Sequence, residues 1–173
     1  IGVAGAGGLL LTQGYRMERI TVWLDPAASE KGHQTIQGLY AIGSGGLFGK
    51  GLGQSMQKLG FLPEANNDMI FSVICEELGL FGALCVLALF FALIWRFMVI
   101  AVNAPDLYGS MIVVGVIAHI GIQVFINIAV ATNTIPNTGI PLPFISYGGS
   151  SLVFMLLEMG LVLSVSRYIN VKK

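Results

Sequence analysis

Three carboxylates lie within ten residues of one another, where a polar turn runs into a long apolar segment. Asp68 stands in the turn, and Glu76 and Glu77 follow inside the apolar stretch. A carboxylate in such a turn can act as a general base, and it can equally cap the helix that follows. Ionisable side chains at membrane depth are costly, so we expect Glu76 and Glu77 to face protein, a cavity or a partner charge. Spacing alone leaves both roles of Asp68 open.

The composition indicates an integral membrane protein. The 173 residues are 55% hydrophobic and only 10% charged, whereas an average soluble domain is about 25% charged. No charge occurs from Leu78 to Trp95, and an uncharged apolar run of this length can cross a bilayer as a helix. The formal net charge is zero, so nothing indicates a nucleic-acid partner.

We expect an all-α polytopic membrane protein with a large polar loop that contains short amphipathic helices. The segment at 132–147 contains too many proline and glycine residues to form a regular helix or strand, and we expect it to be a structured or re-entrant loop. The expected segments are the end of a membrane helix at 1–12, the large loop at 13–67, membrane helices at 69–95, 107–131 and 148–166, the second loop at 132–147 and a tail at 167–173.

Cations at the helix ends predict the orientation in the membrane. Arg96, Arg167, Lys172 and Lys173 fall on one side of the expected helices, and Asp68 falls on the other. Short segments that carry cations face the cytoplasm, while long loops are translocated regardless of charge. We therefore expect Asp68 and the large loop to face outward.

The glycine cluster at residues 43–53 surrounds Lys50 but is not a phosphate-binding Walker A loop. That loop needs four residues between its glycines and a Ser or Thr after the lysine, and neither condition is met here. Two roles remain open. The backbone N–H groups could cradle an anion beside the lysine, or the glycines could allow close packing.

A polar stripe runs along the expected helix at 107–131. His119, Gln123 and Asn127 are spaced four residues apart, so they lie on one helical face. Glu158 stands near the middle of the following helix. Polar residues inside membrane helices most often form hydrogen bonds with neighbouring helices, and we favour this role over a proton relay.

Two long motifs resemble the SEDS family (shape, elongation, division and sporulation). They are GLYAIGSGGLFGKGLGQSMQKLGFLPEANNDMIFSVICEELGLFG and NTIPNTGIPLPFISYGGSSL. The similarity covers nearly the whole chain and is greatest to the division and sporulation members. It implies an all-helical bundle of roughly ten membrane helices, of which this chain resembles only the C-terminal part. We therefore expect preceding helices to contribute to the site, and the 173 residues alone to be inactive.

The resemblance implies a peptidoglycan glycosyltransferase in the bacterial plasma membrane. Its substrate would be lipid II, the undecaprenyl-pyrophosphate-linked disaccharide-pentapeptide. Its expected partners are a class B penicillin-binding protein that crosslinks the glycan strands, other divisome proteins and membrane lipids. Two other classes remain as alternatives: a lipid II flippase or transporter, and a non-enzymatic scaffold that recruits a transpeptidase.

The family's essential aspartate falls on Asp68. The family pattern matches Leu62 to Phe71, with departures at Asn66, Asn67 and Met69. Forming a β-1,4 bond from an α-linked pyrophosphate donor inverts the sugar carbon, so one carboxylate acting as general base is sufficient.

Further residues are implied in binding this substrate. The leaving pyrophosphate needs cations, or a divalent metal such as Mg²⁺ or Mn²⁺, to stabilise its charge. Glu64 would orient an acceptor or a metal, or pair with a lysine. The candidate cations are Lys50, Lys58, Arg16 and Arg19, and the serines expected to line a substrate groove are Ser146, Ser150 and Ser151.

Overall fold

The computed structural model describes residues 19–26, 32–56 and 67–169. Its helices are α2 (His33–Gly45), α3 (Ile70–Val102), α4 (Leu107–Ala131) and α5 (Gly149–Arg167), and residues 19–24 are also helical. These described parts of the chain contain no strand. The expected all-helical class is therefore confirmed.

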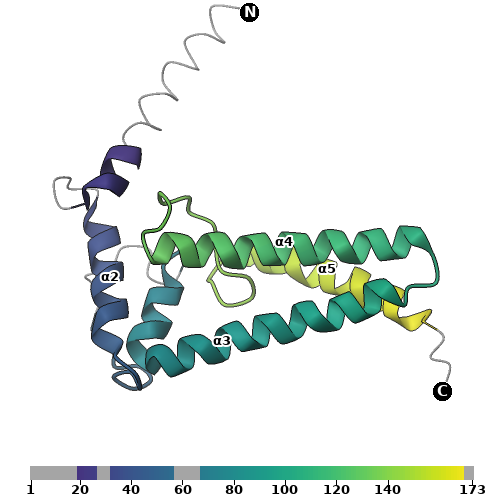
Figure 1. The fold of residues 1–173 in the computed structure, drawn as a ribbon, viewed down its shortest axis with the longest axis horizontal. Coiled ribbons are helices and arrows are strands. Elements are labelled where there is room, and N and C mark those ends of the chain that lie inside the picture. Colours follow the sequence, from purple (N-terminus) through teal and green to yellow (C-terminus); the bar gives the residue numbers. More distant parts are fainter. Residues whose placement is uncertain (1–18, 27–31, 57–66, 170–173) are drawn as a thin grey trace, which may run out of the picture.

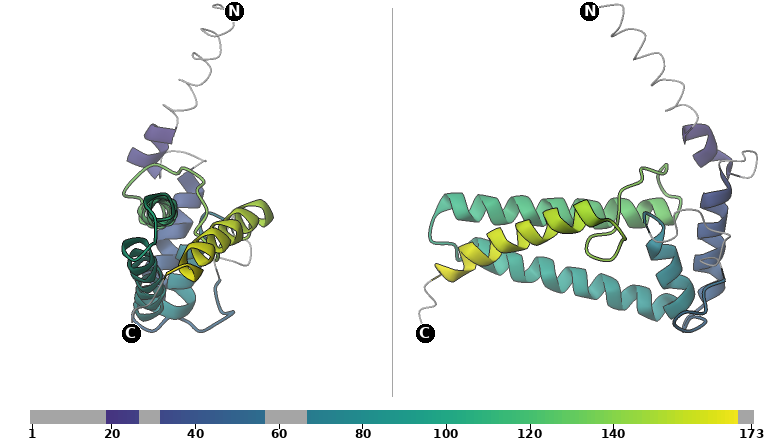
Figure 2. Two further views of the ribbon diagram at one scale, coloured as in Figure 1. Left: turned by 90° about the vertical axis from the view of Figure 1, so that its right-hand side faces the viewer. Right: turned by 180° about the vertical axis from the view of Figure 1, so that it is seen from behind.

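Three of these helices, α3, α4 and α5, are long and apolar enough to cross a membrane. They lie side by side along the long axis of the molecule, and α4 runs opposite to the other two (Figure 1 and Figure 2). Only 11% of the most apolar stretch of α5 is buried within the chain. Such an apolar outer surface suits contact with lipid or with further membrane helices.

The core of this bundle lies in the seam between the three helices. Val113 and Ile120 of α4 are completely buried, as is Val162 of α5, and Met155 of α5 is 1% exposed. Each pair is separated by seven residues. This is the spacing at which one face of a helix repeatedly meets its neighbour.

Helix α3 is bent at Gly79, where the backbone leaves the helical region with φ of 68° and ψ of −167°. Residues 70–78 run beside α2 across one end of the bundle, and the chain then turns along α4 (Figure 1). Glu76 and Glu77, which we expected within the membrane helix at 69–95, lie before this bend. They belong to the layer that α2 forms across the end of the bundle.

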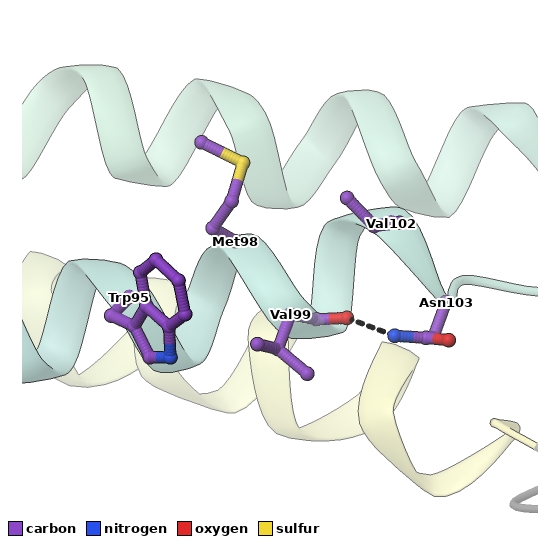
Figure 3. Close-up of a pocket in the computed structure, with 5 residues that line it drawn as sticks. All are labelled: Trp95, Met98, Val99, Val102 and Asn103. Atoms are coloured by element: carbon purple, nitrogen blue, oxygen red, sulfur yellow. Dashed lines mark hydrogen bonds between the residues drawn. The ribbon is translucent and has the colours of Figure 1, made fainter.

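Helix α3 also ends later than Trp95, where the sequence predicted its end. The apolar residues after Arg96 continue the helix to Val102, since one exposed arginine can extend its charge to the membrane surface. Asn103 Nδ2 donates to the carbonyl oxygen of Val99 at 2.7 Å, beside a shallow apolar groove of about 240 Å³ (Figure 3). The same carbonyl also accepts the backbone N–H of Asn103 at 3.2 Å, so Asn103 closes the end of α3 with both its side chain and its backbone.

Candidate functional site

Asp68 lies in the turn before α3, where α2, α3 and α4 meet. It is 8% exposed. Gln34 of α2 donates its Nε2 to Asp68 Oδ1 at 3.4 Å, and Asn127 of α4 donates its Nδ2 to the Asp68 carbonyl oxygen at 2.8 Å. The N-cap residue of α3 is Met69, without a side-chain cap hydrogen bond. The Asp68 carboxylate therefore faces α2 instead of capping α3.

Asp68 is contacted from both α2 and α4. Gln34 is a neutral donor, so it orients the Asp68 carboxylate without supplying a counter-charge. The bond from Asn127 holds the backbone of the same residue, so position and orientation are set from two different helices. Among the residues that the structure describes, no three His, Cys, Asp or Glu side chains are grouped to hold a metal ion.

The loop between α4 and α5 is attached to the turn that carries Asp68. Ser146 Oγ donates to the carbonyl oxygen of Asn67 at 2.5 Å and accepts a backbone N–H of its own loop at 2.7 Å. Asn127 Nδ2, which holds Asp68, also donates to the carbonyl oxygen of Ile140 in this loop at 2.9 Å. Ser146 is therefore a link between the loop and the residue next to Asp68.

The other expected binding residues are placed in different surroundings. Arg19 is exposed, and its Nη1 donates to the carbonyl oxygen of Asn137 at 2.7 Å. Ser150 is exposed and Ser151 half-buried in the first turn of α5. Three further expected residues, Arg16, Lys58 and Glu64, lie outside the described residues.

Lys50 is paired with a buried carboxylate. Its Nζ lies 2.7 Å from Glu76 Oε1, with side-chain exposures of 34% for Lys50 and 0% for Glu76. Ser55 Oγ donates to Glu76 Oε2 at 2.6 Å, and Ser44 Oγ lies 3.4 Å from Oε1. The sequence marked Lys50 and Glu76 separately, and the structure brings them together.

The glycine-rich loop after α2 packs its backbone against the bend of α3. Its N–H groups at Lys50 and Gly51 donate to the carbonyls of Glu76 and Glu77 at 2.9 Å, and two N–H groups beyond the bend donate back to the loop. A Cβ on Gly49 would lie 2.2 Å from the Glu77 oxygen. The N–H groups of Lys50 and Gly51 are thus engaged by protein, which favours close packing over an anion cradle.

The polar stripe on α4 forms the expected hydrogen bond with a neighbouring helix, α5, and it also contacts two loop segments, which was not expected. His119 Nδ1 lies 2.7 Å from Glu158 Oε1, and Gln123 Nε2 lies 3.0 Å from His119 Nε2. The last residue of the stripe, Asn127, holds the turn at Asp68. The stripe therefore connects the middle of the bundle with the end that carries the candidate site.

Sequence reasoning missed Gln34, a side chain that contacts the Asp68 carboxylate. A signal for it was present in α2. Half-buried Gln34 begins a row on one helical face that continues with Gly38, Ala41 and Gly45. These three small residues are buried in the helix that packs on α3. The small residues allow α2 to approach closely, so a polar side chain at the end of this row faces the neighbouring segment.

The chain matches known proteins along nearly its whole length. A model of the cell cycle protein family FtsW/RodA/SpoVE matches residues 1–171. Stage V sporulation protein E of Bacillus subtilis is 56% identical over 172 residues, which are 97% of this chain and 46% of that protein. A protein named probable peptidoglycan glycosyltransferase FtsW, from Geobacter sp. (strain M18), is 43% identical over 96% of this chain and 46% of its own.

Solved structures with a similar fold include a peptidoglycan synthase complex and a rod shape determining protein. One chain, from a structure described as "Structural coordination of polymerization and crosslinking by a peptidoglycan synthase complex", has a TM-score of 0.69 at 29% identity, covering 98% of this chain and 49% of that one. The rod shape determining protein RodA of Thermus thermophilus has a TM-score of 0.58 at 39% identity, over 76% of this chain and 39% of its own. The chain thus spans about half the length of the relatives it matches.

Proposed function

The chain belongs to the SEDS family of multi-pass membrane proteins, which includes FtsW, RodA and SpoVE, and from this membership we propose that the full-length protein is a peptidoglycan glycosyltransferase. It polymerises lipid II into glycan strands during bacterial cell division or sporulation. The names of the FtsW relatives support the reaction class. Because this chain spans 46% of those relatives, the remaining helices complete the site, and the 173 residues alone are inactive.

Asp68 is the general base of the proposed reaction. Its carboxylate takes the proton from the attacking sugar hydroxyl while that oxygen bonds to the anomeric carbon of the donor. The bond from this carbon to undecaprenyl pyrophosphate breaks, and the configuration is inverted. One observation carries the assignment: a buried carboxylate on the matched motif, oriented by Gln34 and held through its backbone by Asn127.

The leaving pyrophosphate requires positive charge near Asp68. We propose Lys50, Lys58, Arg16 and Arg19 for this role, with a divalent cation as the alternative. Of these, Lys50 already has a carboxylate partner, so contact with the pyrophosphate would have to compete with Glu76. Glu64, Ser146 and Ser150 remain proposed substrate contacts.

The proposed orientation places Asp68 at the outer face of the plasma membrane. Arg167 ends α5 at the opposite end of the bundle from the turn at Asp68, and exposed Arg96 lies toward the end of α3 (Figure 1). Cations beside short segments face the cytoplasm. A class B penicillin-binding protein is the proposed partner. The similar chain in a peptidoglycan synthase complex supports it.

The decisive experiment uses the full-length protein, purified with its candidate transpeptidase and given labelled lipid II. Wild type is compared with Asp68→Asn and with Asp106→Asn, and glycan polymer is measured on a gel. Asp106 caps α4, and asparagine caps a helix equally well, so this control keeps full activity. A general base contributes about 100-fold to 10,000-fold in rate, and Asp68→Asn should lose at least about 100-fold.

The other outcomes separate the alternatives. Equal polymer from wild type and Asp68→Asn would remove Asp68 from the chemistry. If wild type makes no polymer, the enzyme proposal is wrong. The His119–Glu158 pair within the membrane-length helices would then favour a transporter, and partner binding without transport would favour a scaffold.

A further inference from the structure

A buried carboxylate joins the loop after α2 to the first segment of α3. Glu76 is 0% exposed. Its Oε1 lies 2.7 Å from Lys50 Nζ, and its Oε2 accepts a hydrogen bond from Ser55 Oγ at 2.6 Å. Both donors come from the loop that follows α2, and Glu76 comes from α3. The contact therefore holds two segments together across 26 residues of sequence.

The same loop stabilises the bend at Gly79. A bend breaks the regular helical ladder and leaves backbone carbonyls and N–H groups without partners inside the helix. Here the carbonyls of Glu76 and Glu77 accept the N–H groups of Lys50 and Gly51. The side-chain pair and the backbone bonds thus act on the same loop and favour the same closed position.

The Lys50–Glu76 pair favours this loop position over any position in which the loop has moved away from α3. A carboxylate that is buried without its partner carries a large desolvation penalty, so the structure favours the loop position in which Lys50 reaches Glu76. Glu76 follows Asp68 by eight residues, which at about 1.5 Å per helical residue is roughly 12 Å along the chain axis. The position of the loop therefore determines the position of residues 70–78, the short helical segment that Asp68 precedes.

We propose that Glu76, through its pair with Lys50, is a positioning residue for Asp68, an inference that rests on the proposed glycosyltransferase function. The pair closes the glycine-rich loop on the bend of α3 and holds residues 70–78 against α2. Gln34 of α2 is thereby kept within reach of the Asp68 carboxylate. Lys50 would then act through Glu76, as the alternative to the direct contact with the substrate pyrophosphate proposed above.

The exposures of the two partners predict an order among variants. In Lys50→Met the buried Glu76 carboxylate loses the ammonium that lies 2.7 Å from it. In Glu76→Gln the ammonium is left over, but Lys50 is one-third exposed and can turn to water. The double variant, Lys50→Met with Glu76→Gln, removes both charges of the pair. We therefore expect Lys50→Met to be the most damaging of the three, and the double variant to recover part of the loss.

The test measures kcat, KM for lipid II and melting temperature for the full-length protein with these three variants, Lys50→Arg and the control Asp106→Asn. Misplacing a catalytic group by about 1 Å can cost about 100-fold in rate. We expect Lys50→Met to lower kcat by about 10-fold to 100-fold with KM unchanged. The double variant should lie between Lys50→Met and wild type, and Lys50→Arg should restore most of the rate.

Three results would overturn the inference. The first is a raised KM in Lys50→Met with no recovery in the double variant, which would make Lys50 a substrate contact. The second is a wild-type kcat in Glu76→Gln. The third is an equal melting temperature for all variants. Absence of polymer in wild type would instead refute the proposed function. The melting temperatures would still test the pair, because the predicted order does not depend on catalysis.

Discussion

Replacing Gly45 by alanine tests how closely α2 must approach α3. A Cβ at Gly45 would lie 1.9 Å from the carbonyl oxygen of Cys75, 2.8 Å from its carbonyl carbon and 3.0 Å from the Cα of Glu76. These are backbone atoms of a helix, so no side-chain rotation can relieve the overlap. Ordinary contact starts at 3.4 Å. The two segments would thus have to separate by about 1.5 Å, far beyond what a close-packed interface tolerates without loss.

That separation would break the hydrogen bonds between the loop and the bend of α3. Four such backbone bonds have lengths of 2.9 to 3.1 Å, with donors at Lys50, Gly51, Leu80 and Phe81. Each contributes about 0.5–1.5 kcal/mol net. Losing all four would cost roughly 2–6 kcal/mol of the free energy of unfolding.

The assay is thermal unfolding of the full-length protein in lipid nanodiscs, with Gly43→Ala as the matched control. Gly43 lies in the same helix, and a Cβ there would meet nothing within 4 Å. Alanine at such a position stabilises a helix by about 0.5–1 kcal/mol. Gly45→Ala should lower Tm by at least about 2 °C, and Gly43→Ala should keep or raise it. Equal Tm values for Gly45→Ala and wild type would refute the packing argument.

Two further contacts give predictions of the same kind. Ser146→Ala removes the hydrogen bond to Asn67 and one hydrogen bond within the loop, so it should lower the free energy of unfolding by about 1–3 kcal/mol. The control Ser150→Ala, at an exposed position, should change this free energy by less than about 0.5 kcal/mol. Equal melting temperatures for the two variants would contradict this prediction. His119→Leu leaves Glu158 without its partner at 2.7 Å, so we expect it to be less stable than the double variant with Glu158→Leu. A double variant less stable than His119→Leu would show that Glu158 has another favourable contact.

The sequence by itself determined the fold class and the family. Long apolar runs in a chain with 10% charge leave membrane helices as the solution, because backbone groups in lipid must find partners within their own segment. The motif around Asp68 carried the family resemblance, which the match over residues 1–171 confirms. The polar stripe could also be predicted, because helical periodicity alone places His119 and Gln123 on one face of the helix.

Only the tertiary structure decided how the candidate site is held. The sequence around Gly79 is compatible with a straight apolar helix, and the bend exists because a loop about 30 residues earlier supplies partners for its backbone groups. The same holds for the pair of Lys50 with Glu76 and for the bond from Asn127 to the carbonyl of Asp68, which joins residues 59 apart. Helical periodicity describes which residues share a face within one segment. It does not determine which distant segment that face meets, because that depends on the packing of the whole chain.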